Sequence, residues 1–137
     1  VIGDIDFFKR INDQFSHATG DAVLRQVGEI LRSHMRLSDL VARYGGEEFV
    51  LLLPDTDASA AERLAGEIIA SVEARQIPHP ASPVSPFITI SLGGITMTPL
   101  GGHPDPRFFQ EADAALYAAK AEGRNRANWR QSLTVSN

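Results

Sequence analysis

The sequence predicts an α+β domain in which helices flank a mixed, mainly antiparallel central sheet. Three observations lead to this prediction. A short apolar segment opens the chain and is followed directly by two segments with helical periodicity. A glycine-centred hairpin pattern comes next, at positions 39–53. A helix, a strand and a further helix then alternate, so strands distant in sequence are expected to pair, with the helices packed on them.

The opening strand is predicted over residues 1–6, which read Val-Ile-Gly-Asp-Ile-Asp. It is apolar at first and acidic at its carboxyl end. Side chains alternate along a strand, so Asp4 and Asp6 are expected on the same side. Aromatic and aliphatic residues at helical spacing then predict a helix over residues 7–15.

A second helix is predicted over residues 21–35, after an interruption at residues 16–20. Its apolar positions recur at helical spacing and are Val23, Leu24, Val27, Ile30 and Leu31. Apolar runs on both sides of Gly45-Gly46 then predict a β-hairpin with arms at residues 39–44 and 48–53. Glycine adopts the positive φ values that such a tight turn demands.

The second half of the chain is predicted to begin with a helix. Ser59 and Glu62 read as a capping box that opens a helix running to about residue 74. Residues 77–86 contain four prolines and are predicted to be a loop. Residues 87–97 alternate and are rich in β-forming residues, which predicts a strand.

This strand is expected to carry a bulge at Gly93-Gly94. A loop over residues 99–106 and a helix over residues 106–121 follow, and Gly123 ends the helix. Residues 126–133 are expected to form a short final strand. The complete order indicates a sheet built in ferredoxin-like manner.

The composition is that of an ordinary globular domain. The 137 residues are 43% hydrophobic and 22% charged, which is enough to bury a core without disulfides. Thirteen Lys and Arg against 17 Asp and Glu give a net charge of −4, which argues against non-specific binding along nucleic acid. The absence of cysteine excludes a disulfide framework and a thiolate zinc site. Uninterrupted apolar runs, such as residues 49–53, are far too short to cross a bilayer.

Carboxylates are predicted to converge where the first strand ends and the hairpin turns. If these strands are neighbours, Asp4, Glu47 and Glu48 meet at one edge of the sheet. Like charges so close raise one another's pKa and disfavour folding unless a cation neutralises them. Oxygen ligands of this kind suit Mg²⁺, which takes its remaining ligands from water and substrate phosphates. Taken alone, Asp4 and Asp6 are equally well explained by a strand-end turn or a helix cap.

Three further features have a plain structural interpretation beside a functional one. Gly45 and Gly46 let a ligand approach the backbone closely, although a surface hairpin with solvated acids fits the same pattern. Lys120 and Arg124 are four positions apart at the end of the last predicted helix, where positive charges interact favourably with the helix dipole. Spacing alone supports this structural interpretation better than a binding role. Arg36 and Asp39 are consistent with a surface ion pair, which would contribute little to the stability of the fold.

Together, these motifs resemble those of the GGDEF-domain diguanylate cyclases, which condense two GTP molecules into cyclic di-GMP and release two pyrophosphates. The resemblance spans residues 1 to about 129 and implies a sheet like that of nucleotidyl cyclases and polymerase palm domains. Its motifs, in order, are residues 4–13, the positions His17, Gly20, Asp21 and Leu24, the hairpin Gly45-Gly46-Glu47-Glu48-Phe49, residues 88–93 and residues 112–125.

The resemblance also implies roles for individual residues. Asp4, Glu47 and the Ile5 carbonyl would bind Mg²⁺, with Mn²⁺ as a second candidate. Lys9 would stabilise charge in the transition state, and Glu47 or Glu48 would help to deprotonate the ribose 3′-hydroxyl. The residues implied to contact GTP are Phe7, Phe8, Asn12, His17, Asp21, Leu24, Gly45, Gly46, Lys120 and Arg124.

Within this set, Asn12 and Asp21 would hydrogen-bond guanine, because a carboxylate can accept from both its N1–H and its N2–H. Leu24 would pack against the base, and Lys120 and Arg124 would hold phosphates. One site holds one GTP while the product needs two, so a homodimer with facing sites is implied. Arg36-x-x-Asp39 is similar to the family's inhibitory site, which binds the product cyclic di-GMP.

Two departures from the family pattern bear on these expectations. Ser16 stands where the family usually has glycine, which predicts a slightly reshaped loop near guanine. The family's upstream segment is missing, so residues 1–137 are interpreted as a single catalytic domain truncated at its N-terminus. A sensory or receiver domain is expected upstream in a cytoplasmic parent, either free or tethered to a membrane. The alternatives are a catalytically silent module that senses GTP or cyclic di-GMP, and an interaction domain without nucleotide.

Overall fold

The computed structural model describes residues 1–98, 106–130 and 133–134. The predicted loop over residues 99–106 and part of the predicted final strand therefore lie outside the described residues. The elements, in chain order, are β1 (Ile2–Ile5), α1 (Phe8–Gln14), α2 (His17–Ser33), β2 (Leu40–Arg43), β3 (Glu48–Leu52), α3 (Ala58–Ala74), β4 (Ile90–Gly94), β5 (Met97–Thr98), α4 (Pro106–Ala121), β6 (Ala127–Trp129) and β7 (Leu133–Thr134).

The main sheet has the strand order β2-β3-β1-β4-β6, so the first strand of the chain lies at its centre. β1 is antiparallel to both β3 and β4, while β4 and β6 run parallel. Short β5 and β7 form a separate parallel pair. The predicted mixed sheet with flanking helices is confirmed, and the final strand is present as β6.

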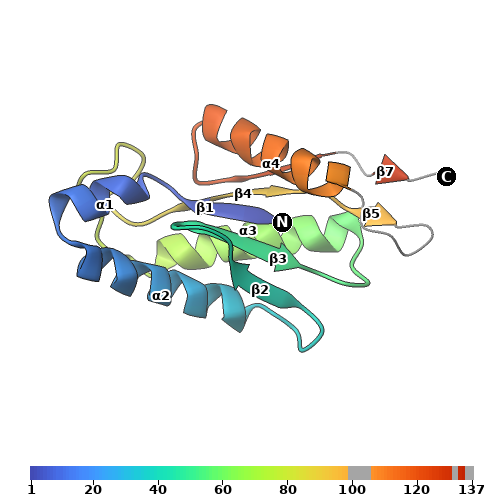
Figure 1. Ribbon diagram of the computed structural model, residues 1–137, viewed down its shortest axis with the longest axis horizontal. Coiled ribbons are helices and arrows are strands. Elements are labelled where there is room, and N and C mark those ends of the chain that lie inside the picture. Colours follow the sequence, from blue (N-terminus) through green and yellow to red (C-terminus); the bar gives the residue numbers. More distant parts are fainter. Residues whose placement is uncertain (99–105, 131–132, 135–137) are drawn as a thin grey trace.

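Helices cover both faces of the sheet. Figure 1 shows α4 on one side of the strands and α2 and α3 on the other, and α4 packs on β4, β6 and β1. The larger core lies under α2 and α3 and includes Ile5, Val27, Ile68 and Leu92. A smaller cluster under α4 contains Ile2, Ile95, Ala112 and Leu116. Because side chains alternate along the strands, each face of the sheet has its own hydrophobic core.

The second helix begins four residues earlier than its apolar pattern predicts. α2 starts at His17 because Ser16 takes the N-cap position, with an extended backbone and a hydroxyl that accepts from the Thr19 N–H at 3.2 Å. The prediction that residues 16–20 interrupt the helices was therefore wrong except at its first residue. Ser16, a departure from the family pattern, satisfies the helix terminus instead of leaving a loop.

The start of α3 also differs from the prediction. Asp57, not Ser59, is the N-cap residue, and its carboxylate accepts from the Ala60 N–H at 2.8 Å. The capping box read from Ser59 and Glu62 was wrong, because an equally good cap stands two residues earlier.

The glycines of β4 serve close packing rather than a bulge. Gly93 pairs with Ile2 on one side and Asn128 on the other, so the ladder is regular there. A Cβ at Gly93 would lie 2.1 Å from the backbone N of Leu116 in α4. A Cβ at Gly94 would lie 2.3 Å from the Trp129 ring. The predicted bulge was wrong: Gly93 allows α4 to contact the sheet directly, and Gly94 makes room for the Trp129 ring of β6.

No helix within the described ranges is both long enough and apolar enough to span a bilayer.

Candidate functional site

Two carboxylates from separate parts of the chain meet at one end of the β1–β3 pair. The register places Asp4 opposite Glu48, and Glu47 precedes Glu48 at the hairpin turn. Asp4 is only 5% exposed, and its carboxylate lies close enough to Glu47 to perturb the ionisation of that side chain. Burial, followed by the negative charge of Asp4, raises the pKa of Glu47 to about 7.

Lys120, in the last turn of α4, donates from Nζ to Oδ2 of Asp4. This ion pair across two elements means that Lys120 does more than complement a helix dipole. The second oxygen of Asp4, Oδ1, is buried and has no hydrogen-bond partner in the described part of the chain. A buried carboxylate oxygen left without a donor is an acceptor available to a ligand or a cation.

The carboxylate pair fits a hard divalent cation but does not enclose one. Within residues 1–98, 106–130 and 133–134, no group of three or more His, Asp or Glu side chains could hold a metal ion. The expected neighbours Asp4, Glu47 and Glu48 are brought to one end of the β1–β3 pair, and Asp4 has a larger influence than Glu48 on the pKa of Glu47. Mg²⁺ commonly binds through one or two carboxylates plus substrate phosphates, so the unpaired Oδ1 of Asp4 and the neighbouring Glu47 carboxylate suit it.

Asp6 has a different function from Asp4, although both side chains are buried. Its carboxylate accepts from the Thr89 hydroxyl at 2.8 Å, the Ser91 hydroxyl at 2.6 Å and the Asn125 N–H at 3.0 Å. The Arg124 guanidinium lies 3.9 Å away. Asp6 therefore has its oxygens satisfied and ties β1 and β4 to the turn after α4. Sequence reasoning missed this function, although alternating hydroxyls in a paired strand were a usable signal.

Arg124 is also held by an aromatic ring. Its guanidinium lies 4.3 Å from the centroid of the Phe7 ring, and Arg10 lies 4.7 Å from the same centroid. Phe7 connects β1 to α1 with a left-handed φ of 54°, and Arg124 and Asn125 have φ values of 64° and 51°. Two left-handed turns thus meet beside the Asp4 end of β1.

Asn12 and Asp21 lie on the other side of the β1–α1 junction, on α1 and α2. Oδ1 of Asn12 is buried and unpartnered within the described ranges. A Cβ at Gly20 would lie 2.0 Å from this oxygen, so a larger residue there would displace the Asn12 amide from its present position. The amide therefore retains hydrogen-bonding capacity that the protein does not use.

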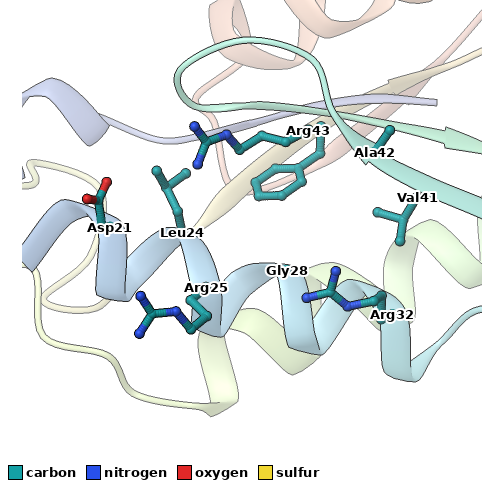
Figure 2. A pocket seen from close by; sticks show the side chains of 9 residues that line it. Asp21, Leu24, Arg25, Gly28, Arg32, Val41, Ala42 and Arg43 are labelled. Carbon is teal, nitrogen blue, oxygen red and sulfur yellow. The ribbon is translucent and has the colours of Figure 1, made fainter.

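A groove of about 430 Å³ runs along α2 beneath the hairpin. Figure 2 shows Asp21 at one end and Leu24 pointing into it, while the Arg43 side chain extends from β2 toward Leu24. Apolar Leu24, Val41 and Phe49 line the groove together with the following residues: Asp21, Arg25, Gly28, Arg32, Ala42 and Arg43. The groove thus combines apolar surface with a row of cations.

Sequence reasoning missed the three arginines of this groove. Arg25 and Arg32 are seven positions apart on α2 and therefore share one helix face, which was a readable signal. None of the three forms an ion pair with any residue that the structure describes. Guanidinium groups of this kind pair with phosphate and stack on aromatic planes.

Other predicted site residues have no contact that assigns a role. Lys9 and His17 are exposed on α1 and α2, and Gly45 and Gly46 are exposed in the hairpin turn. Glu48 is half-buried, and its carbonyl accepts from the Tyr44 N–H at 2.8 Å, which closes the hairpin. The Phe8 side chain lies in the larger core, as does part of Leu24.

Arg36 and Asp39 lie at the opposite end of the hairpin from Glu47, because Leu40 pairs with Leu52. Arg36 donates to both oxygens of Asp39, from Nε at 3.3 and 3.2 Å and from Nη2 at 3.0 Å. Hydrogen bonding to Arg36 holds the pKa of Asp39 below its ordinary value. Arg36 also donates to the Thr56 hydroxyl at 2.7 Å, so the pair is part of a small ordered network.

The sequence matches the family described as "Diguanylate cyclase, GGDEF domain" over residues 1–126. Diguanylate cyclase A of Treponema denticola is 44% identical over 123 residues, which are 90% of this chain and 32% of that protein. Diguanylate cyclase DosC of Escherichia coli is 40% identical over 135 residues, 97% of this chain and 28% of that protein. The chain therefore spans about a third or less of the length of these relatives.

Solved structures give the same result. The GGDEF domain of DgcB from Caulobacter crescentus, solved in complex with c-di-GMP, superposes with a TM-score of 0.80 at 35% identity, covering 93% of this chain and 74% of that one. The active GGEEF domain of a diguanylate cyclase from Vibrio cholerae gives 0.71 at 32% identity, covering 99% of this chain and 81% of that one.

Proposed function

Because the chain belongs to the GGDEF domain family of diguanylate cyclases, we propose that it condenses two GTP molecules into cyclic di-GMP and releases two pyrophosphates. The observation that carries this proposal is the carboxylate pair of Asp4 and Glu47. It lies beside the cation Lys120 and leaves one buried carboxylate oxygen unused. A buried pair of like charges is costly in an inert domain and useful in one that binds a cation and phosphates.

Asp4, Glu47 and the Ile5 carbonyl would hold Mg²⁺ or Mn²⁺. The cation, when bound, would supply charge neutralisation at the phosphates and orient them. Lys120 is paired with Asp4, and we propose that it moves its ammonium group to a phosphate oxygen when nucleotide is bound. Arg124, supported by the Phe7 ring and Asp6, would hold a second phosphate group.

We propose that guanine binds between α1 and α2. Asp21 would accept from the N1–H and N2–H of the base, and the free amide of Asn12 would pair with its remaining edge. Leu24 would pack against the ring, with His17 nearby. The arginines of the groove extend this site along α2 and would attract the polyanionic substrate.

The reaction itself needs two such sites. In each half-reaction the 3′-oxygen of one GTP forms a bond to the α-phosphorus of the other. The bond from that phosphorus to the bridging oxygen of the pyrophosphate breaks in line, and the hydroxyl proton passes to Glu47 or Glu48. Lys9 would stabilise the charge that develops. Two chains with facing sites, related by a two-fold axis, would complete the ring.

Regulation is proposed at two levels. Arg36 and Asp39 would bind cyclic di-GMP as inhibitor, since the exposed Arg36 guanidinium is already held in place by its ion pair with Asp39. An upstream sensory or receiver domain would control dimerisation in the parent protein, and the reaction would take place in the cytoplasm, where GTP is available.

The test is incubation of a dimeric form of the protein with GTP and Mg²⁺, followed by product analysis. The proposal expects cyclic di-GMP and pyrophosphate in a ratio of one to two. Binding of GTP or cyclic di-GMP without release of pyrophosphate would instead favour a silent sensor module. Absence of nucleotide binding would favour an interaction domain.

A further inference from the structure

The proline-containing loop at residues 77–86 is fixed to the turn between β1 and α1. Its ends are held by an isolated bridge between Pro78 and Phe87 and by the Ile88 N–H donating to the Ile77 carbonyl at 2.7 Å. From α1, Arg10 donates to the Ala81 carbonyl of the loop at 2.9 Å. A segment to which the sequence assigned no function thus packs against the predicted site.

His79 makes the innermost of these contacts. Its side chain is fully buried, and its Nε2 lies 3.1 Å from the carbonyl oxygen of Phe7. A carbonyl can only accept, so Nε2 carries the proton in this contact. Nδ1 is buried and has no partner in the described residues, which is compatible with an unprotonated ring nitrogen. His79 therefore acts as a one-directional donor to the Phe7 peptide.

The Phe7 peptide needs such support. Phe7 has φ 54° and ψ 35°, a left-handed conformation that is unfavourable for a non-glycine residue. Its carbonyl also accepts from the Arg10 N–H at 3.1 Å, inside α1. The contact from His79 is the one that comes from outside the local segment. Rotation of this peptide would move the ring on which the Arg124 guanidinium rests, at 4.3 Å.

We propose that His79 is a positioning residue for the phosphate end of the nucleotide site. Its Nε2–H holds the Phe7 carbonyl, the Phe7 ring keeps its place, and Arg124 is thereby held where a phosphate group binds. His79 contacts no substrate. The inference rests on the proposed function, because it assigns Arg124 to phosphate, and it adds a residue and a loop that the nucleotide-binding motifs do not contain.

The experiment compares GTP with guanosine, which has the base and ribose but no phosphates. Calorimetry with the whole chain measures both affinities for the unaltered protein, His79→Leu and His79→Gln. Leucine removes the donor, whereas the longer amide of glutamine places an N–H near the position of Nε2. We expect His79→Leu to weaken GTP binding about ten-fold and to leave guanosine binding within about two-fold, and His79→Gln to recover most of the loss.

Two further variants separate positioning from general damage to the fold. His79→Asn keeps a polar amide but is too short to reach the Phe7 carbonyl, so it should behave like His79→Leu even if leucine disturbs folding. In an Arg124→Ala background, His79→Leu should add less than about a two-fold loss, because the group it positions is already gone.

Equal losses for GTP and guanosine in both His79→Leu and His79→Asn would overturn the inference and leave the proposed function standing. A ten-fold further loss of GTP affinity on adding His79→Leu to Arg124→Ala would also overturn the inference and leave the proposed function standing. Failure of the unaltered chain to bind GTP would overturn the proposed function and this inference with it.

Discussion

Asp4, which lies opposite Glu48 in the β1–β3 register, is a neighbour of Glu47 in the hairpin turn, and burial together with the charge of Asp4 raises the pKa of Glu47 to about 7. The ordinary pKa of a glutamate is 4.5. Between these values the folded chain binds a proton at Glu47 that the unfolded chain has lost. The free energy of unfolding therefore falls as the pH rises from about 4.5 to about 7, and this contribution is level above that.

This relationship predicts a metal effect on stability that depends on pH. A cation binds the ionised pair, so MgCl₂ should raise the melting temperature more at pH 8 than at pH 5.5. Thermal denaturation at both pH values, with and without the salt, measures the difference. An equal Mg²⁺ effect at the two pH values would show that Glu47 is not the titrating ligand.

Turnover is predicted to rise with pH through about 7, because Glu47 must lose its proton to bind a cation. The rate of pyrophosphate release from GTP, followed from pH 6 to pH 8.5 at several fixed Mg²⁺ concentrations, tests this, and the midpoint near 7 is expected at the lowest of them. Bound cation favours the ionised form, so the midpoint should move to lower pH as the Mg²⁺ concentration is raised. A midpoint that does not shift with the Mg²⁺ concentration would contradict the assignment of Glu47 as a cation ligand.

Replacement Glu47→Gln is expected to abolish turnover while the fold persists. The amide removes a metal ligand and one of two like charges, so stability at pH 8 should increase rather than fall. Glu122→Gln, at an exposed position after α4, serves as the matched control and should leave turnover unchanged. Near-normal turnover in Glu47→Gln would count heavily against the proposed mechanism.

Replacement Arg36→Ala is expected to leave the enzyme active and to remove inhibition by cyclic di-GMP. Arg36 lies at the end of the hairpin away from Glu47, so its loss should not alter the carboxylate pair. Inhibition curves with added product compare the variant with Arg75→Ala, another exposed arginine, at the end of α3. Unchanged inhibition in Arg36→Ala would remove the claim of a product site there.

A methyl group at Gly93 should be severely destabilising. Its Cβ would lie 2.1 Å from the Leu116 backbone N, so α4 must move away from the sheet, at a cost of about 3 kcal/mol or more. Gly66→Ala in α3 is the control, because nothing lies within 4 Å of its Cβ position and the helix should gain about 0.5–1 kcal/mol. Denaturant unfolding measures both, and a mild effect at Gly93 would show that α4 is loosely packed.

The sequence was sufficient for the sheet, the helices and the meeting of Asp4 with Glu47, since these follow from periodicity and a strongly marked hairpin. The sequence was insufficient where the role of a residue depends on contacts with a distant segment of the chain. Gly20 reads as a helix breaker but lies inside α2, because Asn12 occupies the space of its missing side chain. Gly93 reads as a bulge for the same reason, with α4 as the hidden neighbour.

The functional division between Asp4 and Asp6 shows the same limit. Asp4 lies in β1 and Asp6 directly follows it, and from their spacing alone either could be a metal ligand. Only the tertiary contacts separate them: Thr89, Ser91 and Asn125 saturate Asp6, whereas one oxygen of Asp4 has no partner among the residues that the structure describes. The roles of His79 and of the groove arginines were not predicted, because single residues in a loop or on an exposed helix face form no recognisable sequence motif.

Under the proposed function, the saturation of Asp6 would also make nucleotide binding conditional on completed folding. The donors to Asp6 are Thr89, Ser91 and the Asn125 N–H in the turn beyond α4, all of which are synthesised well after Asp6 itself. Until the last of them docks, Arg124 lacks its support and the carboxylate lacks its donors. Under the proposed function, a nascent or locally opened chain would therefore lack a positioned Arg124, and affinity for the nucleotide phosphates would be gained only once the turn after α4 is in place.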